Sequence, residues 1–203
     1  MQAYAGSASH TVGFAKREQY SREVMAKAVE TRNLFLKSGL NAEILSGGST
    51  GTYNIDSAIP GVTELQVGSY AVMDVDYQRI GGKENEKFYT DFRSALTVLT
   101  TVVSATHADV VTVDAGVKAF SSSPEPAAKD WPGLTYRRSG DEFGSLTAAA
   151  GAVLPKLGER LEFIAPHCDP TVSLYDQLYA CRGDKVEAVW PITGGRDYAR
   201  KPA

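Results

Sequence analysis

The sequence has few of the residues that mark several classes of protein. Two cysteines, Cys168 and Cys181, in 203 residues are too few for a disulfide framework, so we expect free thiols in a reducing compartment. No apolar run approaches the roughly 20 residues that span a bilayer, and the start MQAYAGSASH lacks the charged and apolar parts of a signal peptide. We therefore expect a cytoplasmic protein that does not bind membranes.

Charge of one sign is also scarce. The formal net charge is -3, and acidic and basic residues alternate along the chain without forming a basic stripe. A protein that follows a phosphate backbone needs such a stripe, so nucleic acid is not an expected partner. The length allows one ordinary domain or two small ones.

The first part of the chain has the pattern of a parallel α/β unit. Residues 14–37 contain no Gly or Pro and place Val24, Ala28, Leu34 and Phe35 at helical spacing, which predicts one amphipathic helix. NAEILS, at 41–46, predicts a short buried strand that runs into a glycine-rich loop. A second extended stretch at 63–67 is also followed by glycine, so we expect two loops at the same end of neighbouring strands.

The second part is predicted to be mostly β. Segments at 95–106, 108–116, 133–138, 159–166, 173–182 and 185–192 are rich in β-branched and aromatic residues, and turn signals separate them. SSSPEPAAKDWPG, at 121–133, predicts a surface loop. We place the boundary near Asp76, which gives an α/β domain at 1–76 and a β domain at 77–203. Half of a parallel sheet leaves a strand edge uncovered, so we expect a homodimer or an N-terminal half chain as partner.

The loop SGGSTGTYN, at 46–54, has the outline of an anion site. Its glycines allow close approach of the backbone to a ligand, and the hydroxyls of Ser49, Thr50 and Thr52 could donate to phosphate oxygens. The loop fits neither the nucleotide P-loop nor G-x-G-x-x-G, so a polar turn is the alternative interpretation. The second loop, at 67–70, favours a small phosphorylated ligand, because two consecutive strand ends commonly hold a phosphate.

PHCDPTVSLYD, at 166–176, places an imidazole, a thiol and a carboxylate side by side. If the strand continues through 161–170, His167 and Asp169 lie on one face and Cys168 on the other. The pair could then share a divalent cation with open coordination positions, with Mn²⁺ or Mg²⁺ preferred over Zn²⁺. A His–Asp hydrogen bond at a strand end is the alternative. Cys168 as a nucleophile is less favoured, since no base for it is evident.

Together these segments resemble the D-threonine aldolase and D-serine dehydratase-like family. The resemblance rests on YAGSASH, SGGSTGTYN, ELQVGSYAVMDVDY, DAGVKAFSS, DEFG, PHCDPTVSLYD and VEAVWPI, in this order. It implies a fold-type III enzyme that uses pyridoxal 5'-phosphate and a divalent metal. The implied fold class is α/β plus β: the C-terminal part of an alanine-racemase-like (β/α)₈ barrel followed by a mostly antiparallel β domain.

The resemblance also implies roles for individual residues. His167 and Asp169 match the metal ligands, and His10 matches the acid or base beside the metal, although it could also be a capping or surface histidine. The residues that match the cofactor phosphate cradle are Gly48, Ser49, Thr50, Gln66, Gly68, Ser69 and Tyr70. The dehydratase branch has a cysteine where this chain has Asp169, which favours the aldolase branch.

Several positions depart from the family pattern. The lysine that binds the cofactor lies upstream in the family, and none of Lys16, Lys27, Lys37 or Lys118 matches it, so we expect the chain to be the C-terminal half of an enzyme. Other departures are Ser9 for Gln, Phe143 in DEFG for His, and TGGR at 193–196 for SARGR. For Lys118 and Asp114 we expect structural roles.

The function implied is cleavage of D-β-hydroxy-α-amino acids to glycine and an aldehyde. A D-serine or 3-hydroxyaspartate dehydratase activity is the first alternative, because the same metal could stabilise a leaving hydroxide. A truncated or split chain that binds ligands without turnover is the second. In each case the expected partner is a small-molecule D-amino acid.

Overall fold

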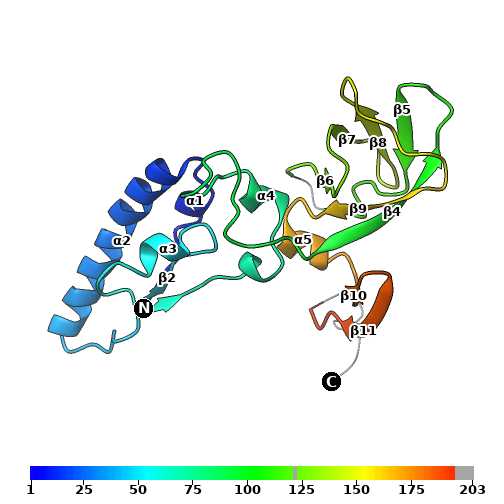
Figure 1. Ribbon diagram of the computed structural model, residues 1–203. Coiled ribbons are helices and arrows are strands. Elements are labelled where there is room, and N and C mark those ends of the chain that lie inside the picture. The colour runs from blue at the N-terminus through cyan, green and yellow to red at the C-terminus, as the bar shows by residue number, and fades with distance from the viewer. Residues whose placement is uncertain (121–122, 195–203) are drawn as a thin grey trace. The chain divides into compact units, whose positions relative to one another are not determined.

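The computed structural model describes residues 1–120 and 123–194, and the chain divides into two compact units, Met1–Arg93 and Ser94–Ala203 (Figure 1). This division falls later than the boundary placed near Asp76. Residues 77–93 belong to the first unit because Tyr77, Ile80 and Tyr89 share a buried apolar cluster with Met73. The end of the TGGR segment and the SS of DAGVKAFSS lie outside the described residues.

The first unit is built on a small parallel sheet. Its elements are β1 (Gln2–Ala3), α1 (Gly6–Ser9), α2 (Phe14–Lys37), β2 (Ser46–Gly47), α3 (Tyr53–Asp56), β3 (Glu64–Leu65), the 3₁₀ turn η1 (Ser69–Ala71) and α4 (Val75–Gln78). The strand order is β1-β2-β3, and both neighbouring pairs are parallel. Of the strand predicted at 41–46, only the last residue, Ser46, lies in a strand. One reason is that the Leu45 N–H donates to the Thr63 hydroxyl rather than to a strand backbone.

Helix α2 has the predicted bounds but buries a different face. The buried residues are Arg17, Ser21, Met25 and Ala28, whereas Leu34 is 57% exposed. Positions four apart, and then three, form a single helical stripe. Two members of this stripe are polar, so the apolar pattern pointed to the wrong face. Met25 and Ala28 pack against Leu45, which lies just before β2.

The second unit is dominated by a six-stranded antiparallel sheet. Its strands are β4 (Thr97–Ser104), β5 (Val110–Val113), β6 (Ala127–Ala128), β7 (Leu134–Arg138), β8 (Gly144–Ala148) and β9 (Arg160–Ile164). The order is β6-β9-β4-β5-β8-β7, and the two outer strands contact each other, so the sheet nearly closes on itself. Its core includes Val113, Phe120, Leu146 and Phe163. Strand β6 lies inside the segment predicted to be only a loop.

A short helix and a hairpin follow the sheet. The helix is α5 (Cys168–Val172), and the hairpin joins β10 (Gln177–Arg182) to β11 (Lys185–Pro191). The prediction of a strand through residue 170 is therefore wrong, since β9 ends at Ile164. Pro170 is the third residue of α5, where a missing backbone N–H costs nothing. No helix in the described ranges is both long and apolar enough to cross a membrane.

Candidate active site

The two glycine loops lie side by side in the first unit. Each follows one of the parallel strands β2 and β3, and the Tyr70 N–H donates to the Thr50 hydroxyl at 3.0 Å. The backbone N–H of Gln66 donates to the Gly47 carbonyl at 2.9 Å, and its side chain reaches the Ser46 hydroxyl. The prediction of two loops at the same end of neighbouring strands is confirmed.

The hydroxyls of the first loop hold the loop itself together. Ser49, Thr50 and Thr52 are each only 1% exposed. The Thr52 hydroxyl accepts the Ser49 N–H at 3.0 Å, and the Ser49 hydroxyl accepts the Gly51 N–H at 3.1 Å. This differs from the expectation that these hydroxyls face an anion, because the backbone N–H groups of a tight turn take them first.

The backbone of these loops still suits a phosphate. Gly48 has a φ of +72°, which favours glycine, and a Cβ there would lie 2.9 Å from Leu65 Cδ2. Gly68 is exposed, and a Cβ there would meet nothing within 4 Å, so a ligand can approach its backbone closely. Behind the first loop, the Arg17 guanidinium donates to the Gly51 carbonyl at 2.7 Å and brings a positive charge near it. The loops therefore suit an anion because of their accessible backbone and the nearby positive charge of Arg17, rather than because of their hydroxyls.

His10 follows α1 and lies against α4. Its Nδ1 is 2.9 Å from Oδ2 of Asp76, and its ring centroid is 4.5 Å from that of Tyr77. Tyr77 is buried, and its hydroxyl lies near Tyr4 and near Ser49 of the first loop. Burial raises the pKa of Tyr77 far above its usual range; Tyr4 adds to the rise and Ser49 opposes it. The neutral phenol ring thus links His10 to the glycine loop.

The backbone before His10 also contacts the first loop. A Cβ on Gly51 would overlap the carbonyl oxygen of Ser9, so only glycine allows this approach. Ser9 is buried, and its hydroxyl donates to the Ala5 carbonyl at 3.1 Å within α1. The side chain of Ser9, which stands where the family has glutamine, thus forms its hydrogen bond within α1.

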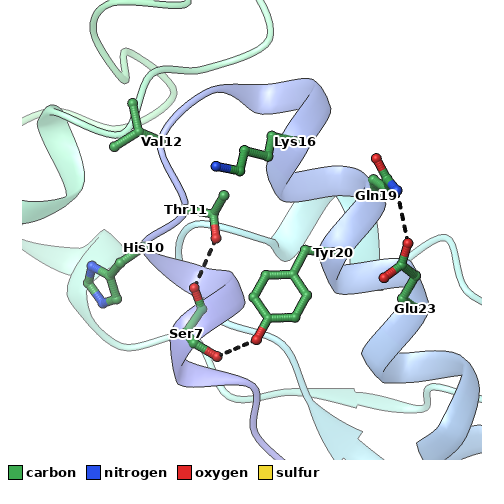
Figure 2. A pocket seen from close by; sticks show the side chains of 8 residues that line it. All are labelled: Ser7, His10, Thr11, Val12, Lys16, Gln19, Tyr20 and Glu23. Carbon is green, nitrogen blue, oxygen red and sulfur yellow. Dashed lines mark hydrogen bonds between the residues drawn. The ribbon is translucent and has the colours of Figure 1, made fainter.

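A groove of about 590 Å³ lies between α1 and the start of α2 (Figure 2). Its lining includes Ser7 and Tyr20, whose hydroxyls are 2.9 Å apart, and Gln19, whose amide donates to Glu23. Figure 2 shows the His10 imidazole turned away from these side chains. His10 nevertheless contributes to the lining of the groove.

His167 and Asp169 come together in the second unit. His167 is the N-cap residue of α5, and Asp169 is in the first turn, so the two side chains approach through a helix start rather than along a strand. The His167 Nε2 and Asp169 Oδ2 atoms are 4.0 Å apart, and the Asp169 side chain is 75% exposed. Two ligands about 2.1 Å from one ion are about 3.0–3.4 Å apart at the usual coordination angles, so a small movement of either side chain would let the pair share a divalent cation.

Cys168 does not lie on the opposite side from Asp169, as the strand alternation had predicted. It is 3% exposed, and its sulfur donates to Oδ1 of Asp169 at 3.2 Å. The helical start brings neighbouring side chains to one end of α5, which a strand would have separated. Buried thiols are commonly inert, which agrees with the low preference for Cys168 as a nucleophile.

The remaining positions singled out from the sequence lie on the surface. Phe143 is 46% exposed, just before β8. Lys118 forms an ion pair with Glu142, which raises the pKa of the lysine, and Asp114 accepts the Thr101 N–H at 2.7 Å. These contacts agree with structural roles for Lys118 and Asp114. Lys16, Lys27 and Lys37 are exposed on α2.

Sequence reasoning did not select three residues that shape this region. They are Asp76, Tyr77 and Arg17, and the first two belong to the DVDY segment that ends one of the motifs quoted above. The motif was available as a signal, but no local pattern says that α4 lies beside His10. Arg17 gave no signal at all, since a basic residue in an amphipathic helix is ordinarily exposed.

Comparisons with known proteins agree with this architecture. Residues 95–181 match the model of the putative serine dehydratase domain. D-threonine aldolase of Arthrobacter sp is 37% identical over 201 residues, which cover 98% of this chain and 52% of that protein. 3-Hydroxy-D-aspartate aldolase of Paracoccus denitrificans (strain Pd 1222) is 35% identical over 201 residues, covering 98% of this chain and 51% of that protein.

A solved structure gives the same result for the fold. The crystal structure of D-threonine aldolase from Filomicrobium marinum matches with a TM-score of 0.88 and 32% identity, over 96% of this chain and 52% of that chain. The expected fold class, with its parallel and antiparallel parts, is confirmed. The chain spans about half the length of the curated relatives that it matches.

Proposed function

We propose that the chain belongs to the D-threonine aldolase and D-serine dehydratase-like family of lyases, and that it carries the metal-binding and acid–base residues of an aldolase. The proposed reaction cleaves a D-β-hydroxy-α-amino acid to glycine and an aldehyde. The observation that carries the proposal is the His167–Asp169 pair, with an imidazole nitrogen and a carboxylate oxygen 4.0 Å apart at the start of α5.

Each group of residues has a part in this proposal. His167 and Asp169 would hold a divalent ion, and the loops at 48–50 and 66–70 would hold the phosphate of pyridoxal 5'-phosphate. When bound, the cofactor would supply an electron sink for the breaking Cα–Cβ bond, and the metal ion would supply a positive charge for the β-hydroxyl. His10 would remove the proton of that hydroxyl. General-base assistance of this kind contributes about 10²- to 10⁴-fold in rate.

The second candidate is a dehydratase that acts on D-serine or 3-hydroxyaspartate. It shares the metal pair, and the match of residues 95–181 to a serine dehydratase domain favours it. Against it stands Asp169, because the dehydratase branch of the resemblance has a cysteine there. A hard oxygen ligand favours Mn²⁺ or Mg²⁺ over Zn²⁺, although selectivity among these ions is loose.

The metal pair is tested by titrating the purified chain with Mn²⁺ and measuring free ion by electron paramagnetic resonance. We expect one bound ion, with affinity at least about tenfold lower in His167→Ala and in Asp169→Asn. His107→Ala is the matched control, since His107 is an exposed histidine of the same unit. Equal affinity in all four proteins would contradict the proposed ligands.

The reaction is tested in a chimera in which this sequence replaces the matching half of the Arthrobacter aldolase. With pyridoxal 5'-phosphate, Mn²⁺ and D-threonine or 3-hydroxy-D-aspartate, we expect glycine and an aldehyde by mass spectrometry. Ammonia with a keto acid would support the dehydratase instead. Retained Mn²⁺ binding without products from a folded chimera would favour a binding role.

A further inference from the structure

Asp76 divides its two carboxylate oxygens between two partners. Oδ2 lies 2.9 Å from His10 Nδ1, and Oδ1 lies 2.5 Å from a guanidinium nitrogen of Arg79. The Asp76 side chain is only 16% exposed. The carboxylate is thus held in place between the imidazole and a guanidinium one helical turn away.

The short helix that carries Asp76 is itself fixed. Asp74 is the N-cap of α4, and its side chain accepts the Tyr77 N–H at 2.9 Å. The Tyr77 ring lies against the His10 ring at an interplanar angle of 35°, and its hydroxyl lies near Ser49. Within DVDY, Asp74 therefore caps the helix, Asp76 presents its carboxylate to His10, and Tyr77 supports the imidazole from one side.

We propose that Asp76 is the positioning residue for His10: it accepts the Nδ1 proton and so places the imidazole lone pair on Nε2. This inference rests on the proposed role of His10 as a base. During cleavage the hydroxyl proton moves to Nε2 and the imidazole becomes positively charged, and the carboxylate of Asp76 stabilises that charge. Aspartate supports histidine in this way in other acid–base sites.

The tautomer can be measured without turnover. The chain has three histidines, so long-range ¹H–¹⁵N correlation spectra can be assigned with His10→Ala, His107→Ala and His167→Ala. In the wild-type chain, we expect neutral His10 to be protonated on Nδ1. In Asp76→Asn we expect this form to fall to a minor fraction, because the amide can donate to Nδ1 and favour the Nε2–H form. Asp76→Glu, which keeps the carboxylate, should restore the wild-type tautomer.

Asp91→Asn is the matched control, because Asp91 is an acid of the same unit that accepts a hydrogen bond from Tyr53 at 3.1 Å. Its His10 tautomer should equal that of wild type. Amide spectra establish that each variant is folded. An unchanged tautomer in a folded Asp76→Asn chain would overturn the proposal.

Activity in the chimera separates this inference from the function on which it rests. We expect Asp76→Asn to lower kcat by about 10²-fold or more, within the range of general-base contributions. A shifted tautomer with unchanged kcat would leave Asp76 as the positioning residue but remove His10 from the chemistry. A lower kcat with the wild-type tautomer would overturn the positioning role and keep the aldolase.

Discussion

Arg17 shows how one side chain can join distant parts of the first unit. It is fully buried, and its guanidinium donates to the carbonyls of Thr11, Gly51, Ile80 and Gly81 at 2.7–3.1 Å. Burial lowers the pKa of Arg17, while Tyr89 and Asp91 nearby oppose the shift. The group still stays protonated at neutral pH, because arginine is not deprotonated in proteins. It therefore ties the segment after His10 and the glycine loop to the segment after α4.

Replacing Arg17 by Met should destabilise the chain strongly. The change leaves buried carbonyls without donors, and hydrogen bonds to charged groups contribute about 1.5–3 kcal/mol each, though not additively. We expect the free energy of unfolding to fall by about 3–5 kcal/mol, measured by urea unfolding followed by circular dichroism.

Arg22→Met is the control for this prediction. Arg22 lies on the same helix, and its guanidinium pairs with Glu18 at 2.8 Å on the surface. Exposed pairs of this kind contribute less than about 1 kcal/mol, so this variant should unfold almost like wild type. Similar losses in both variants would mean that the carbonyl contacts of Arg17 add no stability.

At the residue scale, the sequence identified several side chains but not their neighbours. His10, His167 and Asp169 were selected because imidazoles and carboxylates are chemically conspicuous. Asp76 was not, although it lay in a quoted motif, because its contact with His10 joins positions 66 residues apart. Such contacts depend on how elements pack, which residue type alone does not specify.

The glycine loop shows what matters at the scale of an element. Its shape depends on hydroxyl–backbone hydrogen bonds inside the loop and on the close approach of the chain before His10. Glycine at position 51 is required by space rather than by an unusual φ, because a Cβ would overlap the Ser9 carbonyl oxygen. The carbonyl oxygen of Gly51 also accepts a hydrogen bond from Arg17.

Gly51→Ala should therefore lower stability through crowding. Overpacking of this kind typically costs about 1–3 kcal/mol, and each kcal/mol corresponds to a Tm shift of roughly 2–4 °C in a chain of this size. Thermal unfolding measures the change. Gly6→Ala is the control: its Cβ would lie 3.4 Å from Tyr4 Cε1, an ordinary contact, so its Tm should not fall. An unchanged Tm in Gly51→Ala would show that the backbone shifts without cost.

Two predictions about secondary-structure elements were wrong, the strand through residue 170 and the buried face of α2, because local sequence patterns there conflict with other interactions. Residues 165–170 follow an apolar strand pattern, but Asp169 and Pro170 in HCDPTV are typical of the first turn of a helix, and the helix forms there. On α2 the bounds were correct because no Gly or Pro interrupts it. Its buried face was wrong, because Arg17 and Ser21 are buried by polar contacts rather than by apolar character.

At the scale of the whole molecule, the chain consists of two units with different architectures. The segment between them, from the end of α4 to the start of β4, has no helix or strand among the described residues. Tyr89 anchors its middle, since its hydroxyl donates to the Thr50 carbonyl at 2.7 Å. Arg93 lies beyond this anchor and is exposed.

Limited digestion with trypsin should therefore give an early cut after Arg93. Proteases prefer exposed segments without regular structure, and the two units on either side keep their own cores. Intact-mass spectrometry should detect a fragment that begins at Ser94, and Arg93→Gln should abolish that early product. An earliest cut inside α2 or β4 would contradict this division of the chain.

The sequence by itself determined the bounds of α2, the β-rich character of the second unit, the adjacent glycine loops and the similarity to the aldolases. Periodicity, turn residues and motifs are local, and these features depend on local preferences. Only the tertiary structure decided the buried face of α2, the inward hydroxyls of the loop and the Asp76 contact with His10. Each of these follows from packing between segments distant in sequence, where burial and hydrogen bonding outweigh local preference.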